Sequence, residues 1–174
     1  MRLLPFISIP IIVTLYLVLK HNDHDILTIT RSIMLLSFGY IAAYTDIKTR
    51  KIPNKLILTI LASWVVIMVV FAIVDFKAFP AILLESVFAG TIGALVFIVI
   101  RIITKRGVGG GDVKLAIVMA LLLTAEKTVL MIMVSLLLAA LVSAFLLMLK
   151  RVTLKTKIPF APFMFAGVLV SILV

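Results

Sequence analysis

Long apolar runs dominate this chain and restrict the folds open to it. Hydrophobic residues make up 64% of the 174 positions, whereas soluble proteins contain about half. A soluble chain of this length cannot bury so much apolar surface in one core. The sequence therefore predicts an all-α fold, a polytopic membrane helix bundle, forming a single integral-membrane domain over residues 1–174.

About seven membrane helices are expected, one for each apolar run. Their predicted ranges are Leu3–Leu19, Ile26–Thr45, Leu56–Val74, Ala81–Ile103, Val113–Thr124, Thr128–Leu149 and Phe160–Val174. The fifth would be about 18 Å long against a hydrocarbon core of roughly 30 Å, so we expect it to begin or end inside the membrane. No small-x-small cleavage site follows the first run, so we interpret it as a retained helix.

The composition excludes several kinds of site. The chain has no cysteine, so it can form neither disulfides nor a cysteine zinc site. Its two histidines, His21 and His24, lie in one short polar segment, and we expect no metal and no cofactor. The net charge of +10 does not indicate nucleic acid, because aromatic residues are not interleaved with the basic ones.

The basic residues instead orient the helices across the membrane. One set of loops contains twelve of them, while the opposite loops contain three, Lys20, Lys77 and Lys127. The twelve are Lys48, Arg50, Lys51, Lys55, Arg101, Lys105, Arg106, Lys114, Lys150, Arg151, Lys155 and Lys157. Positive loops mark the cytoplasmic side, so this basic end of the bundle is expected to face the cytoplasm.

A glycine-rich segment, Gly107–Lys114, interrupts the apolar pattern and places Asp112 at the start of the next helix. Glycines permit positive φ angles and a close approach of another backbone, so we expect such a role for Gly109, Gly110 and Gly111. An ionisable group at a membrane-helix end is a candidate functional site. Two plainer interpretations remain open: a helix-capping Asp112, and glycines that form only a flexible connector.

A second acid, Asp46, is predicted to return to the same face of the membrane. It closes the second apolar run, and the 66 residues to Asp112 hold two spans and their loops. Two spans bring the chain back to the side it left, where helix ends can lie about 10 Å apart. The sequence thus allows a carboxylate pair, although Asp46 alone is equally well explained as a solvated interfacial acid.

These residues resemble the type IV prepilin peptidase family of membrane aspartyl proteases. The similarity covers roughly Leu35 to the C-terminus and rests on three motifs that occur in the family's order. They are Asp46 six residues before Ile52-Pro53-Asn54, then Gly109-Gly110-Gly111-Asp112 with Val113-Lys114-Leu115, then Ile158-Pro159-Phe160-Ala161-Pro162-Phe163.

The resemblance implies an aspartic endopeptidase with Asp46 and Asp112 as catalytic residues. It implies a prepilin or pseudopilin-like substrate, whose basic leader is removed at the cytoplasmic face of a bacterial or archaeal membrane. Residues 26–174 would form the catalytic core, and residues 1–25 an additional helix and loop. Methyltransferase activity is not expected, because family members with that activity carry cysteine pairs and this chain has none.

The other motif residues are given supporting roles. Lys114 either tunes the local electrostatic field or is an ordinary interfacial lysine. Asn54 is expected to cap the third helix, and Pro53, Pro159 and Pro162 are expected to set where helices begin. Two other functions remain open: a small transporter with proton or cation sites at the acids, and a non-catalytic factor of pilus or secretion assembly.

Overall fold

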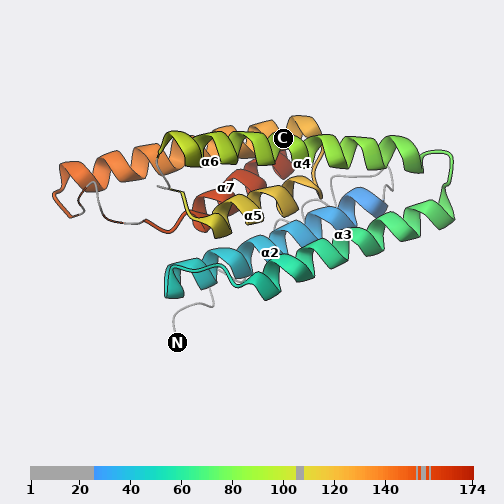
Figure 1. Ribbon diagram of the computed structural model, residues 1–174, viewed down its shortest axis with the longest axis horizontal. Helices are drawn as coiled ribbons and strands as arrows, with labels where there is room; N and C mark the ends of the chain where they lie inside the picture. Colours follow the sequence, from blue (N-terminus) through green and yellow to red (C-terminus); the bar gives the residue numbers. More distant parts are fainter. Residues whose placement is uncertain (1–25, 105–107, 152, 154–155, 157) are drawn as a thin grey trace.

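A computed structural model of the chain describes residues 26–104, 108–151, 153, 156 and 158–174 (Figure 1). Within these residues the fold contains six helices and no strand, which confirms the all-α prediction. The helices are α2 Ile26–Thr49, α3 Asn54–Val74, α4 Phe79–Ile103, α5 Gly110–Ala120, α6 Ala125–Met148 and α7 Ala161–Leu173. The expected first helix, Leu3–Leu19, lies outside the described residues.

Successive helices run in opposite directions along the long axis of the molecule (Figure 1). As a result, the last turns of α2, α4 and α6 and the first turns of α3, α5 and α7 all lie at the same end of the bundle. All three sequence motifs lie at these junctions, so the topology gathers them at one end of the bundle. This is the arrangement expected from the even number of helices between Asp46 and Asp112.

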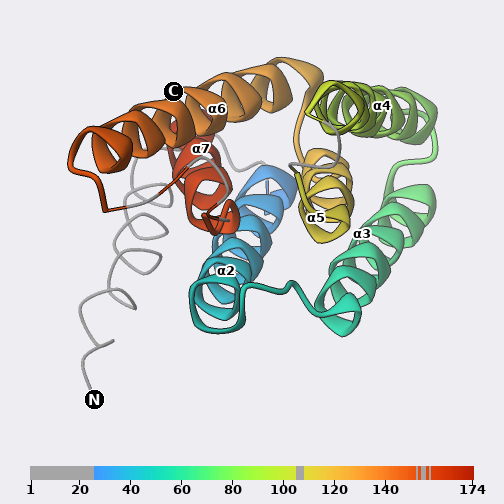
Figure 2. The same cartoon turned by 60° about the vertical axis from the view of Figure 1, so that its left-hand side comes forward.

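Two groups of helices make up the bundle. In the first, α7 packs against both α2 and α6, and in the second, α5 packs mainly against α4. The two groups meet chiefly where α4 contacts α6, while α3 has fewer contacts and lies at the edge (Figure 2).

Small residues let α4 and α5 approach closely. A Cβ atom at Gly93 would lie 3.1 Å from the Cβ of Ala120 and 3.3 Å from the carbonyl oxygen of Ala116. Close contacts between small residues replace the hydrophobic driving force that is missing inside a membrane.

Three of the described helices, α3, α4 and α6, are long and apolar enough to cross a membrane. They expose much of their apolar surface, as expected where lipid covers it. The described residues therefore support a membrane protein with three such helices, which is fewer than the seven spans expected. With 11 residues, α5 is about 16 Å long, which agrees with the short helix expected at this position.

Two predicted helix boundaries near the motifs were wrong. The helix predicted to close at Asp46 continues for one more turn and ends at Thr49, where Arg50 adopts a φ of 52°. Left-handed residues of this kind commonly terminate helices. The fifth helix begins at Gly110, three residues earlier than predicted, so two of the motif glycines are helical.

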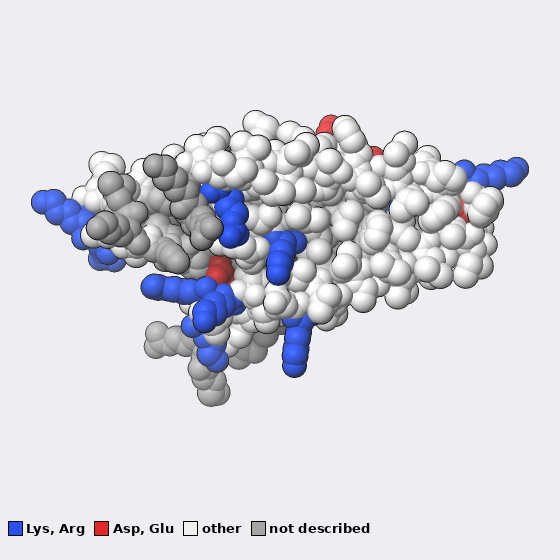
Figure 3. All heavy atoms as spheres, viewed as in Figure 1, with Lys and Arg blue, Asp and Glu red and all other residues white. Residues whose placement is uncertain are grey.

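Basic side chains gather around the end that holds the motifs, as Figure 3 shows for one face of the molecule. The described members are Lys48, Arg50, Lys51, Lys55, Arg101, Lys114, Lys150 and Arg151. Described acids at this end are Asp46 and Asp112, whereas Asp75, Glu85 and Glu126 belong to the opposite end. The two aspartates are thus surrounded by positive charge.

Candidate active site

Asp46 is buried and contacts the start of α7. Only 5% of its surface is exposed, and its Oδ2 accepts a hydrogen bond of 3.0 Å from the backbone N–H of Ala161. The first N–H groups of a helix lack partners within it, and they favour negative charge nearby. The alternative of a solvated interfacial acid is therefore wrong for Asp46.

Asp112 lies in the first turn of α5, and its Oδ2 accepts a hydrogen bond of 3.1 Å from the N–H of Gly109. This contact is one half of a capping box, and the other half is missing because glycine has no side chain. The capping interpretation of Asp112 is therefore correct. It does not exclude a second role, because one carboxylate oxygen remains for other partners.

The two aspartates interact electrostatically across the bundle. Burial and, to a smaller extent, the negative charge of Asp46 raise the pKa of Asp112, the hydrogen bond from Gly109 lowers it, and the net result is a pKa of about 6. Asp112 precedes the apolar part of α5 and lies outside α3, α4 and α6, the helices long enough to span a membrane. The fold thus makes one carboxyl group of the pair easier to protonate than a free aspartate.

The glycines beside Asp112 act through their small size. No described glycine has a positive φ, and Gly109 is extended. The expectation of positive φ angles at these glycines was therefore wrong. A Cβ at Gly110 would lie 2.8 Å from Nη1 of Arg101, and one at Gly111 would lie 3.3 Å from the Cβ of Ile52. Side chains of the same chain therefore approach these two glycines closely, while the expected approach of another backbone stays a prediction.

Two contacts join the segment after Asp46 to the helix that carries Asp112. The first is the packing of Ile52 against Gly111. The second is a hydrogen bond of 3.3 Å from Nζ of Lys114 to Oδ1 of Asn54. Asn54 was expected to cap α3, but Pro53 occupies the N-cap position and the Asn54 side chain is used in this contact instead.

The prolines stand where helices start, as expected. Pro53 has a φ of −69° and directly precedes α3, while Pro162 is the second residue of α7 and Pro159 lies just before its N-cap, Phe160. Proline suits these positions because the first helical N–H groups have no partner within the helix. The ring of Phe160 also packs edge-on against Phe97 of α4, with centroids 5.6 Å apart, which links the third motif to the second helix group.

The functional group that sequence analysis missed is the backbone N–H of Ala161. The sequence does indicate that a helix starts at this position, because Pro159 and Pro162 are typical of helix starts, and the position belongs to the basic end. Nothing local connected that start with Asp46, which is 115 residues away. In the part of the chain that the structure describes, no group of three or more His, Asp or Glu side chains is placed to hold a metal ion.

Comparison with known proteins adds an independent result. Residues 33–148 match the family model of the type IV leader peptidase family. The prepilin leader peptidase/N-methyltransferase of Bacillus subtilis (strain 168) is 31% identical over 148 residues, or 82% of this chain and 54% of that protein. This chain thus spans about half the length of that relative. No solved structure matches the chain.

Proposed function

Since the chain belongs to the type IV leader peptidase family, as its motifs suggested, we propose that it is a membrane aspartyl endopeptidase. Its substrates would be prepilin-like proteins, with a basic leader in the cytoplasm and an apolar helix in the membrane. The observation that carries this proposal is the coupled pair Asp46 and Asp112, in which the charge of one raises the pKa of the other.

The pair has the asymmetry that water activation needs. In the proposed mechanism the pair holds its one proton on Asp112, while Asp46 remains charged against the N–H of Ala161. Asp46 takes a proton from a water molecule, and the resulting hydroxide attacks the scissile carbonyl carbon. Asp112 donates a hydrogen bond to the developing oxyanion, and Asp46 passes the proton that it took from water to the departing amine nitrogen as the peptide bond breaks.

Substrate binding would strengthen this asymmetry. A substrate helix that covers the pair removes water from Asp112, which is only half-buried in the free protein. Further desolvation disfavours the charged form of a carboxyl group and raises its pKa beyond the value of about 6. The protonated form needed for catalysis is then favoured at the near-neutral pH of a cytoplasm.

Leader removal on a gel tests the proposal. The chain is co-expressed with a candidate prepilin, as wild type and as Asp46→Asn, Asp112→Asn and Asp75→Asn. We expect both motif variants to reach the membrane and to leave the leader uncut, with rates reduced by at least about 10³-fold. Asp75→Asn, a matched change at the opposite end, should process normally. Continued processing in either motif variant would refute the two-aspartate mechanism.

Peptidase activity alone is proposed for this chain. The Bacillus subtilis relative is named for both leader peptidase and N-methyltransferase activity. Our prediction that methyl transfer is absent rests on the lack of cysteine pairs. Mass spectrometry of the processed prepilin checks it, because a methylated N-terminus would be 14 Da heavier by the mass of one CH₂ group.

A further inference from the structure

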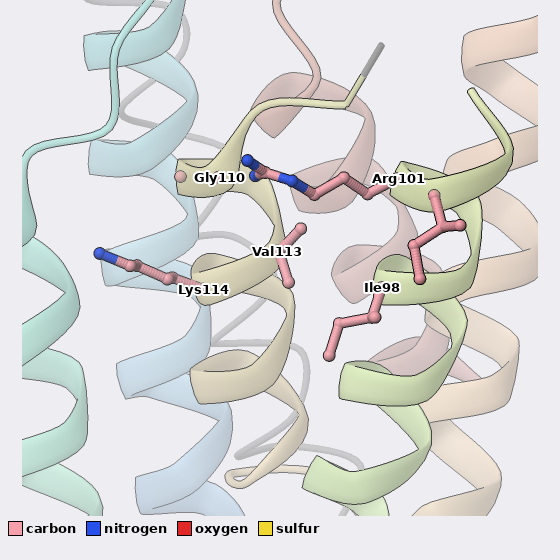
Figure 4. Close-up of a pocket in the computed structure, with 7 residues that line it drawn as sticks. Ile98, Arg101, Gly110, Val113 and Lys114 are labelled. Carbon is pink, nitrogen blue, oxygen red and sulfur yellow. The ribbon is translucent and has the colours of Figure 1, made fainter. Parts of the chain in front are cut away.

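A cleft of about 910 Å³ opens between α4 and α5 at the basic end of the bundle (Figure 4). Arg101, Gly110 and the side chain of Val113 line it, together with Ile98 and Ile102 from the last turns of α4. Neither Asp46 nor Asp112 is part of its lining. The cleft therefore borders the candidate active site without including its two carboxyl groups, since Gly111 and Lys114 also line it.

Arg101 crosses this cleft and places its guanidinium beside the first turn of α5. Figure 4 shows the side chain running from α4 toward Gly110, while Lys114 extends the other way, toward α3. Gly110 leaves the necessary room, because a Cβ there would lie 2.8 Å from Nη1. Among the described residues, none forms a hydrogen bond or an ion pair with Arg101.

This placement concentrates positive charge, which the carboxyl group of Asp112 in the same first turn of α5 offsets only in part. The N-terminus of a helix carries a partial positive charge and attracts anions, so a guanidinium beside it brings two positive groups together. A bound anion between them removes the repulsion and accepts hydrogen bonds from both. Arginine pairs especially well with phosphate, since its planar fork can donate two parallel hydrogen bonds.

The walls of the cleft indicate which phosphate would bind. Arg101 lies in the last turn of α4, a helix long enough to span a membrane, and thus at headgroup level. Ile98, one turn before Arg101, is 43% exposed and continues the cleft toward the membrane interior, while Ile102, which is 70% exposed, lies at the outer end of α4. Apolar walls below a cation match the headgroup and the acyl chain of a lipid, whereas a free phosphate would leave these walls unused.

We propose that the cleft between α4 and α5 binds an anionic phospholipid, with its phosphate on Arg101 and the start of α5. The lipid would fill the space between the two helices and neutralise the guanidinium. It would also hold α5 against α4, since its phosphate contacts both. This inference concerns lipid binding alone and holds or fails independently of peptidase activity.

Native mass spectrometry of the full chain tests the inference. The protein is purified in detergent and mixed with phosphatidylglycerol or phosphatidylcholine, and the retained lipid is counted for wild type, Arg101→Gln and Arg151→Gln. Arg151 is an exposed arginine at the same basic end that does not line the cleft. We expect wild type and Arg151→Gln to retain phosphatidylglycerol preferentially, and Arg101→Gln to retain roughly tenfold less.

A second variant, Gly110→Ala, keeps every charge and displaces the guanidinium, so it should also lower retention. Equal losses in Arg101→Gln and Arg151→Gln would reveal diffuse attraction to the basic end and overturn the proposal. Undiminished retention in Arg101→Gln would overturn it as well. Displacement of the lipid by inorganic phosphate alone, or by a soluble acidic peptide at equal concentration, would assign the cleft to another ligand.

Discussion

Asp112 links the stability of the fold to pH. Its pKa is raised from 3.8 to about 6, so the folded state holds this proton more tightly than the unfolded state does. Its stabilising contribution is then fully present below pH 3.8 and is lost as the pH rises through about 6. Asp112→Asn, which cannot ionise, should be as stable as wild type at pH 4 and more stable at pH 7.

Thermal unfolding of the detergent-solubilised protein at several pH values measures this difference. Other acids titrate in both proteins, so the difference in Tm between variant and wild type isolates Asp112. A difference that stays constant between pH 4 and pH 7 would contradict the raised pKa.

The contact between Lys114 and Asn54 is expected to matter more for activity than for stability. It is an exposed hydrogen bond, and such contacts contribute less than about 1 kcal/mol to folding. It nevertheless ties α5 to the segment that follows Asp46, and small displacements of catalytic groups cost large factors in rate. Lys114→Met should therefore lower leader removal about tenfold with little change in Tm.

Lys55→Met is the matched control, because this neighbouring lysine is exposed and its side chain forms no hydrogen bond or ion pair with the described residues. Asn54→Ala should reproduce the effect of Lys114→Met, and the double variant should be no worse than either single one. Additive losses would mean that the two side chains act separately.

The residues of the site were more predictable than their contacts. The pairing of Asp46 with Asp112 followed from counting spans, which needs no knowledge of side-chain packing. The partner of Asn54 did not, because Lys114 lies 60 residues away and a cap is the usual use of asparagine before a helix. Pro53 took the cap position, and that left the Asn54 side chain available.

Among the helix contacts, the crossing of α6 and α7 depends most on a single glycine. A Cβ at Gly167 would overlap the carbonyl oxygen of Met131 and the hydroxyl of Ser135. Alanine normally stabilises a helix relative to glycine, so destabilisation here would be a specific effect of crowding. We expect Gly167→Ala to cost about 1–3 kcal/mol, because a backbone carbonyl cannot move aside easily.

Gly39→Ala in α2 is a suitable comparison. A Cβ there would meet only side-chain atoms, at 2.9 Å from Phe165 and 3.1 Å from Met119, and these can rotate. Thermal or denaturant unfolding of both variants should show a clearly larger loss for Gly167→Ala. Similar stabilities would mean that the helix crossing adjusts without cost.

Helix ends were the least predictable part of the elements. The end of α2 was placed at Asp46 because charge begins there, yet the helix continues through Ile47 and Lys48 to Thr49. Lysine is a good helix former, and the turn stops only where Arg50 takes a left-handed conformation. Such a conformation depends on the packing of the following loop. An arginine in the sequence gives no local indication of it, whereas a glycine would.

At the scale of the whole molecule, charge orients the bundle. Lys51 belongs to the basic end, which we propose faces the cytoplasm, and Asp75 belongs to the opposite end. The natural chain has no cysteine, so single cysteines can be labelled selectively. With a membrane-impermeant maleimide, Asp75→Cys should react in intact cells and Lys51→Cys only in inverted membrane vesicles. The reverse pattern would exclude cleavage at the cytoplasmic face.

The all-α architecture was predictable because a membrane admits few alternatives for apolar chains. The order of the helices and the shortness of α5 followed from the lengths of the apolar runs. What composition did not show is which helices pair, since the apolar faces of α3, α4 and α6 offer similar surfaces to lipid and to protein. Small residues such as Gly93 and Gly167 determine which helices pair, because they allow close contacts with a neighbouring helix. These contacts could not be predicted without knowing which helix is the neighbour.

The division of the bundle into two helix groups has a consequence for biosynthesis. Asp46 belongs to the group of α2, α6 and α7, whereas Asp112 belongs to the group of α4 and α5. Under the proposed mechanism, both carboxyl groups must be in place to activate water. A chain in which only one helix group has assembled has only one of them in place and is inactive. If the proposed function is correct, the newly made chain is therefore inert toward neighbouring membrane proteins until its last packing step.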